Sequence, residues 1–154
     1  MVKKLVISGF SLFLLSFTPN VYTAPVAPCD KICGRWQSEK KNCIVEVSRD
    51  DDDFVAKLVW FDASDDATKP METRVDYKNP DKNLRNRKLI GMSILEGLEY
   101  KPKTDSWENG KIYDAQTGKH WSAAASLVSP TSLKVTGYWH FKFIGRSMVF
   151  HRIQ

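Results

Sequence analysis

The strongest constraint on the fold is a succession of short apolar segments separated by turn residues. Each segment is rich in β-branched or aromatic side chains, which favour strands. The eight expected strands cover residues 34–38, 43–49, 54–61, 89–98, 106–114, 119–128, 132–141 and 146–153. Regularly spaced short strands are typical of an all-β sandwich or barrel. The simplest topology is an eight-stranded up-and-down barrel, because each strand pairs with the next and closure removes the exposed edges.

Several turns between these strands are marked by their residues. The acidic run 50–53 is expected to form a turn, with a calcium loop as the alternative. An Asn-Gly signal at 109–110 predicts a turn ahead of a short strand. Asp114 and Gly118 bracket a further turn and are assigned structural roles.

The expected interior combines large and small side chains. An eight-stranded barrel is just wide enough for side chains or one small ligand. The large inward residues are expected to be Trp60, Trp121 and Trp139, and the small ones Gly91, Ala123, Ala125 and Gly137. Two interpretations stay open. The small residues leave a cavity whose aromatic walls suit an apolar ligand, or they only make room for the tryptophans.

Residues 1–24 are predicted to be a secretory signal peptide that is removed from the mature protein. Lys3 and Lys4 form its basic start, and residues 5–17 are an apolar run too short to span a bilayer comfortably. An uncleaved membrane anchor is the alternative. The protein is therefore expected to be exported, and either periplasmic or secreted.

The cleavage point is left open between residues 23 and 28, with Ala24 and Ala27 as candidate last residues. Residues 29–154 have the length of one ordinary domain. No membrane span is expected after cleavage, and the oligomeric state is undetermined.

Charge and cysteine content narrow the function classes. The formal charge of +5 includes two signal-peptide lysines, and no stripe of basic residues indicates nucleic-acid binding. Cys29, Cys33 and Cys43 lie close together in the sequence. An oxidising compartment permits one disulfide among them, whose pairing stays open, and we interpret these cysteines as structural.

The connection of residues 62–87 is unusually long for a compact domain, which is typical of a lid or binding loop. Asn79 is a suitable N-cap, Pro80 fits the first helical position, and Asp81 favours the positive end of a helix dipole. These residues predict one or two turns of helix over 80–86, which would form a short lid at one end of the barrel.

Leu84 is expected to point from this lid into the barrel, with Arg85 and Arg87 at the rim. One hypothesis is that the two arginines bind an anionic head group, because a guanidinium matches a carboxylate or phosphate. The favoured alternative is that they form ion pairs that hold the lid down. The candidate partners for those ion pairs are Asp76, Asp81 and Asp114.

Two ends of the chain carry a pattern that resembles the calycins, the lipocalin and avidin-like barrels. Gly34 and Trp36 form a Gly-x-Trp on the first strand, and Arg152 lies on the last strand. The resemblance implies that the Arg152 side chain packs over Trp36 and closes the bottom of the barrel. A guanidinium on an indole face contributes about 0.5–2 kcal/mol.

Longer motifs resemble the DUF2147 family of small exported bacterial proteins over residues 32–153. The motifs are AKLVWF, NPDKNLRNRKLIG, WENGKIYDAQTGKHW, LKVTGYW and GRSMVFHR, in that order. This resemblance implies a lipocalin-like barrel and no established reaction. Two positions depart from the family pattern: Lys88 replaces the usual Pro, and HWSAAA at 120–125 replaces a Tyr followed by Ser-Cys.

Catalytic and metal motifs are missing from the sequence. There is no G-x-S-x-G and no phosphate-binding Gly-rich loop. His120, His140 and His151 lie on different expected strands, so no metal or other cofactor is expected. The function expected is non-catalytic binding of a small apolar or amphipathic ligand inside the barrel. The alternative is a filled barrel that acts as an envelope interaction or inhibitor module.

Overall fold

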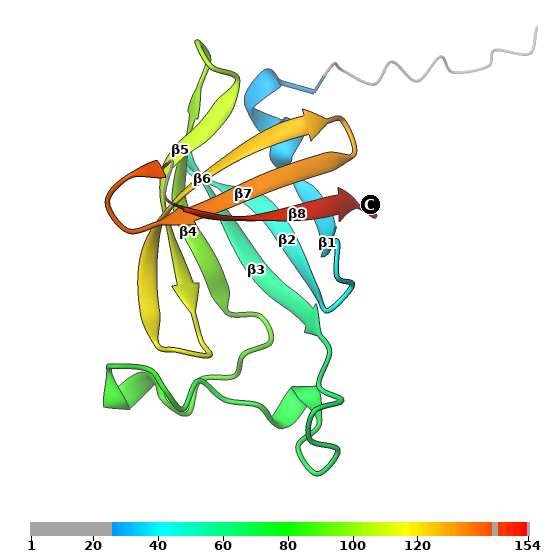
Figure 1. Ribbon diagram of the computed structural model, residues 1–154, viewed down its shortest axis with the longest axis vertical. Helices are drawn as coiled ribbons and strands as arrows, with labels where there is room; N and C mark the ends of the chain where they lie inside the picture. The colour runs from blue at the N-terminus through cyan, green and yellow to red at the C-terminus, as the bar shows by residue number, and fades with distance from the viewer. Residues whose placement is uncertain (1–25, 143–144, 154) are drawn as a thin grey trace, which may run out of the picture.

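The computed structural model describes residues 26–142 and 145–153. They form a closed barrel in which each strand pairs with the next and the last pairs with the first (Figure 1). The strands are β1 (Gly34–Ser38), β2 (Cys43–Asp50), β3 (Asp53–Phe61), β4 (Ser93–Lys101), β5 (Ser106–Asp114), β6 (Lys119–Ser129), β7 (Ser132–Tyr138) and β8 (Arg146–Arg152). Every pairing is antiparallel. The predicted all-β, eight-stranded up-and-down topology is therefore confirmed.

Helical structure in the described ranges includes three complete 3₁₀ turns and no α-helix. These are η1 (Pro28–Ile32), η2 (Met71–Thr73) and η3 (Lys82–Leu84). No described helix has the length and apolar character needed to cross a bilayer. The predicted signal peptide, residues 1–24, lies outside the described residues.

The seam between β1 and β8 closes the barrel. Trp36 is paired with Arg152 in the register, and the Arg152 guanidinium lies 4.1 Å from the centroid of the Trp36 ring. Arg152 Nη1 also donates to the Cys33 carbonyl oxygen at 2.7 Å. Gly34, with φ of 125°, turns the chain from η1 into β1 in a region that favours glycine. The expected packing of Arg152 over Trp36 is confirmed.

Large buried side chains fill the end of the barrel that η1 covers. Trp36, Phe54 and Trp107 are fully buried, and Ile32 of η1 packs among them. The Trp107 indole Nε1 donates to the Cys29 carbonyl oxygen at 3.0 Å, which fixes η1 over this end. Two indoles are thus buried without an unsatisfied donor, since Trp36 Nε1 donates to the Ile32 carbonyl oxygen at 2.8 Å.

The main differences from the predicted strands lie in β4, β5 and β7. The apolar residues 89–92 belong to the connection, so β4 begins at Ser93. The strand β5 continues through Asn109, whose φ of 65° marks a bulge rather than the predicted turn. The strand β7 ends at Tyr138, three residues earlier than expected.

Candidate ligand-binding site at the open end of the barrel

The connection between β3 and β4 is fastened to the barrel by a buried carboxylate, Asp76. Its Oδ2 accepts hydrogen bonds from Asn79 Nδ2 at 2.7 Å and from Arg87 Nη2 at 2.9 Å. Its Oδ1 accepts one from the Tyr113 hydroxyl of β5 at 2.7 Å. Asp76 is completely buried, and all its partners are present, as a buried charge requires. We call these four residues the Asp76 clamp.

The clamp holds a charged carboxylate beside a neutral phenol. Burial alone would raise the pKa of Asp76, but the hydrogen bonds from Asn79, Tyr113 and Arg87 bring it below the ordinary value. The pKa of Tyr113 is raised to about 12, first by burial and then by its bond to the Asp76 carboxylate. At neutral pH the Asp76 carboxylate is therefore ionised and the Tyr113 hydroxyl is protonated.

The clamp contains an ion pair of the kind that the second interpretation of the arginines expected. Arg87 pairs with Asp76, as the ion-pair alternative expected, and its guanidinium also lies 5.8 Å from the Tyr113 ring centroid. Arg85 Nε donates to the Asn79 carbonyl oxygen at 2.8 Å. Leu84 is exposed, so its expected entry into the barrel is wrong.

The helical segment is shorter than predicted and has a different cap. The 3₁₀ turn η3 begins at Lys82, and the Asp81 side chain accepts from the Asn83 N–H. The assignments of Asn79 as N-cap and Pro80 as first helical residue are therefore wrong. Asn79 is instead buried, and its Oδ1 accepts from the Asp81 N–H at 2.9 Å.

The turn between β5 and β6 also contacts the β3–β4 connection. Asp114 Oδ1 accepts from the Gln116 N–H at 2.9 Å, which confirms its expected turn role. Gly118 has a φ of 70°, and a Cβ at this position would overlap the Lys78 carbonyl oxygen. Gly118 is therefore required by backbone conformation and by close contact with the connection.

An aromatic pair marks the end of the barrel away from η1. Trp121 lies opposite Ile112 in the β5–β6 register, on the inward face. Trp139 follows the end of β7, and the two indoles meet edge-to-face with centroids 5.7 Å apart. Trp139 is 65% exposed, so its predicted interior position is wrong. An open pocket of about 540 Å³ is lined by Lys119, His120, Trp121 and Trp139.

The third tryptophan of the predicted set, Trp60, faces away from the core. A register shift between Ile44 and Val45 places Trp60 opposite Ile44, whereas Leu58 lies opposite the buried Val45. Residues directly opposite each other share a face, so Trp60 lies on the outer side with Ile44. The expectation of an inward Trp60 is wrong.

Small residues inside the barrel make room for larger neighbours. A Cβ on Gly137 would lie 3.5 Å from Ile112 and 3.9 Å from Trp121, which is ordinary contact distance. Ala123 and Ala125 are buried in the core cluster. Gly91 is exposed and lies in the connection, outside the interior. The second interpretation, close packing against large residues, fits Ala123 and Ala125, whereas Gly137 has room for a Cβ.

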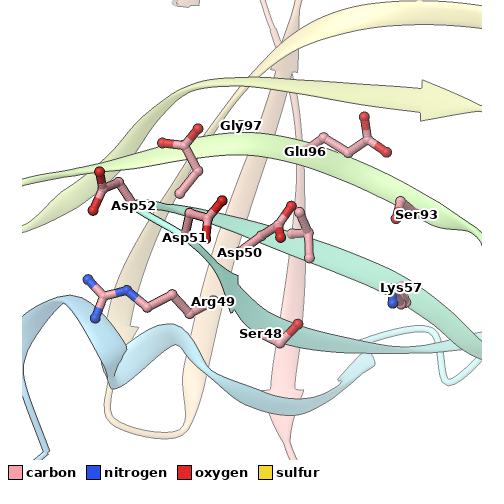
Figure 2. Close-up of a pocket in the computed structure, with 11 residues that line it drawn as sticks. Ser48, Arg49, Asp50, Asp51, Asp52, Lys57, Ser93, Glu96 and Gly97 are labelled. Atoms are coloured by element: carbon pink, nitrogen blue, oxygen red, sulfur yellow. The ribbon is translucent and has the colours of Figure 1, made fainter.

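A second hollow lies on the outer wall and is polar. Figure 2 shows acidic side chains of the β2–β3 turn beside β4. The open hollow has a volume of about 710 Å³ and is lined by Ser48, Arg49, Asp50, Asp51, Asp52, Asp53, Val55, Lys57, Ser93, Glu96 and Gly97. Within residues 26–142 and 145–153, no group of three or more His, Cys, Asp or Glu side chains is arranged to hold a metal ion.

The three cysteines are free thiols in the structure. Cys29, Cys33 and Cys43 are half-buried and pack against the core. Burial raises the pKa of Cys33, which keeps that thiol protonated at neutral pH.

The comparisons with known proteins agree with this architecture. The model of the DUF2147 family, "Uncharacterized protein conserved in bacteria", matches residues 34–152. The structure is similar to that of protein HP1028 from Helicobacter pylori, which is described as belonging to the lipocalin family. The TM-score is 0.68 at 24% identity, and the match covers 80% of this chain and 83% of that one. No curated protein matches the sequence. The chain belongs to the DUF2147 family and has a lipocalin-like barrel.

Proposed function

We propose that this protein is a non-catalytic, exported binding protein that holds a small apolar or amphipathic molecule at the open end of its barrel. The observation that carries the proposal is the exposed edge of the Trp121–Trp139 pair beside an open pocket. A tryptophan that is 65% exposed leaves a large apolar surface in water, and covering it is favourable.

The site proposed is a rim pocket, because large side chains occupy the opposite end of the barrel. Met148 supports this placement. It is paired with the buried Val135, so it faces inward, yet it is 46% exposed. An inward side chain in contact with water indicates that the barrel is open near the start of β8.

Native mass spectrometry of the protein purified from its own host tests this proposal. We expect added mass that disappears on denaturation. A titration with anilinonaphthalene sulfonate, a fluorescent amphiphile, should show that Trp139→Ala weakens binding about tenfold, because an aromatic contact worth about 1.4 kcal/mol is removed.

Val128→Ala is the control, since Val128 is also largely exposed, at 66%, but does not line the pocket. Its affinity for the dye should remain within twofold of the unmodified protein. Absence of added mass, together with equal affinities for both variants, would contradict a ligand at this pocket.

The filled core favours a second candidate function, an envelope module that acts through its surface. Trp139 and Phe141 follow β7 and are 65% and 60% exposed. Aromatic residues are enriched at protein interfaces. A photo-crosslinking amino acid at position 141, expressed in the host, should then capture one protein partner. Lack of a crosslinked species alongside retained ligand mass would favour the carrier.

A further inference from the structure

The connection between β3 and β4 is divided into halves of opposite charge. Residues 62–74 carry four carboxylates and two cations, whereas residues 75–88 carry five cations and two carboxylates. In the acidic half, Arg74 donates to the Asp65 carboxylate and to the carbonyl oxygens of Lys69 and Ala63. In the basic half, Arg87 is the one cation that is ion-paired to a carboxylate among the described residues.

Four cations of the basic half are exposed and have no carboxylate partner in the part of the chain that the structure describes. They are Lys78, Lys82, Arg85 and Lys88. The two carboxylates of this half are already engaged, because Asp76 is buried in its clamp and Asp81 caps η3. Asp81 still offsets one of the four charges, so this surface keeps a net charge of +3.

Two exposed apolar side chains belong to the same segment as these cations. Tyr77 is 65% exposed and Leu84 is 39% exposed. The Lys78 ammonium lies 5.6 Å from the Tyr77 ring centroid. We define the basic face as Tyr77, Lys78, Lys82, Leu84, Arg85 and Lys88. Cations that surround an apolar tip are the combination that binds the interfacial region of a bilayer.

The basic face is presented by an ordered loop. The Asp76 clamp holds the middle of the segment, and a β-bridge joins Val75 to Lys88 across its base. Figure 1 shows the connection, in green, lying beyond the end of the barrel, with η3 at its left-hand side and the loop that follows β3 projecting furthest. A fixed surface on a segment that lies outside the barrel can meet a flat partner without steric hindrance from the barrel wall.

We propose that the basic face docks on the surface of an anionic phospholipid bilayer. Electrostatic attraction supplies most of the affinity, and Leu84 and Tyr77 enter the head-group region. Gly118 contacts the carbonyl oxygen of Lys78, so the same docking brings Lys119 and the rim pocket close to the bilayer. The inference does not depend on which molecule the pocket binds.

Vesicle binding of the full chain tests the proposal. Sedimentation with vesicles of phosphatidylglycerol and phosphatidylcholine in equal amounts should show binding that falls steeply as salt is raised. The triple variant Lys78→Gln, Lys82→Gln, Lys88→Gln should reduce the partition coefficient about a hundredfold, at roughly fivefold per lysine near an anionic surface. Adding Leu84→Ser to the triple variant should reduce the partition coefficient by roughly a further fivefold.

The matched control replaces three exposed lysines elsewhere, Lys57, Lys103 and Lys134, with Gln. An equal loss of binding in this control would overturn the proposal, because net charge would then explain the result. Equal binding to pure phosphatidylcholine vesicles would overturn it as well. Hydrogen exchange localises the contact independently of residues 1–25. Amides of residues 77–88 should gain protection with anionic vesicles, and vesicle binding without that protection would refute docking through this face.

Discussion

Replacing Asp76 with Ala should release the β3–β4 connection from the barrel. The substitution removes the acceptor for three side-chain hydrogen bonds, from Asn79, Arg87 and Tyr113. It also leaves the Arg87 guanidinium without its only ion-pair partner among the described residues. The Tyr113 hydroxyl and the Asn79 amide then lie in a buried space without partners, which is the expensive way to lose a hydrogen bond.

The magnitude follows from the burial of the carboxylate. Breaking a buried charge pair by removing one partner costs about 3–5 kcal/mol. The Arg87 side chain is 38% exposed and can regain water, so the low end of that range applies. Tyr113→Phe removes one hydrogen bond and leaves the ion pair, which should cost about 1.5 kcal/mol. The ratio of the two stability losses, that of Asp76→Ala to that of Tyr113→Phe, is therefore a more exact prediction than either loss alone.

Native-state hydrogen exchange measures this loss of stability at the backbone amides of the connection itself. The Asp76 N–H is bonded to the Arg87 carbonyl oxygen, and the Asn79 N–H to the Asp76 carbonyl oxygen. In Asp76→Ala these amides should exchange roughly a hundredfold faster, since each 1.4 kcal/mol is tenfold. Asp114→Ala, which loses only exposed turn contacts, is the control. Exchange within about threefold of the unmodified protein in Asp76→Ala would refute the assigned role of the clamp.

The remaining predictions concern the seam, the β5–β6 turn and pH. Arg152→Ala should lower the free energy of unfolding by about 2–3 kcal/mol in urea titrations, because the contact with Trp36 and charge-assisted hydrogen bonds are lost; an effect under about 0.5 kcal/mol would contradict the closing role. Gly118→Ala should lower the melting temperature far more than Gly91→Ala. Both have positive φ, but only the first Cβ meets a backbone carbonyl; equal shifts would argue against that contact. The pKa of Tyr113 is raised from 10.0 to about 12 in the folded state. Its contribution to stability is thus complete below pH 10 and is lost as pH rises towards 12. Tyr113→Phe should flatten this part of the melting-temperature profile, and an unchanged slope would contradict the assignment.

The depressed pKa of Asp76 gives a separate expectation on the acid side. Its stabilising contribution is present above the ordinary value of 3.8 and is lost as pH falls through the lower folded-state pKa. Protection of the Asp76 and Asn79 amides should therefore decrease below about pH 4. Protection that stays constant down to pH 2 would mean that the ionised carboxylate does not hold the connection.

The fold was predictable because local signals agreed with the global topology. The enrichment of β-branched and aromatic residues in short segments and the turn chemistry of Asp114 and Gly118 depend on neighbouring residues, which the sequence displays directly. The pairing of Trp36 with Arg152 came from a resemblance to calycins rather than from periodicity. The structure confirms it through the β1–β8 register.

Two of the errors share a physical cause, which is that a single extra residue in a strand inverts the direction of the next side chain. The bulge on β3 turns Trp60 outward, and no residue type near it predicts a bulge. The same applies to Asn109, where an Asn-Gly pair forms a bulge inside β5. Such irregularities are fixed by pairing with distant strands.

The candidate site was less predictable than the fold. The ion-pair alternative for Arg87 was foreseen because acidic residues lie near it in sequence. However, Tyr113 was missed as the partner on the barrel, since it lies 37 positions from Asp76. Trp139 was misplaced because β7 ends one residue before it. A strand end depends on where the neighbouring strand stops pairing, which alternation alone does not reveal.

The seam between β1 and β8 has a consequence for the order in which the protein folds. The bond from Arg152 Nη1 to the Cys33 carbonyl oxygen joins positions 119 residues apart. Contacts of such long sequence separation carry a large loop-closure entropy and form slowly. Until β8 has been synthesised, β1 and β7 each present an unpaired edge, which invites association with other chains. A nascent chain of this family therefore remains vulnerable to aggregation until its last strand docks, and a holding chaperone would be most useful before that moment.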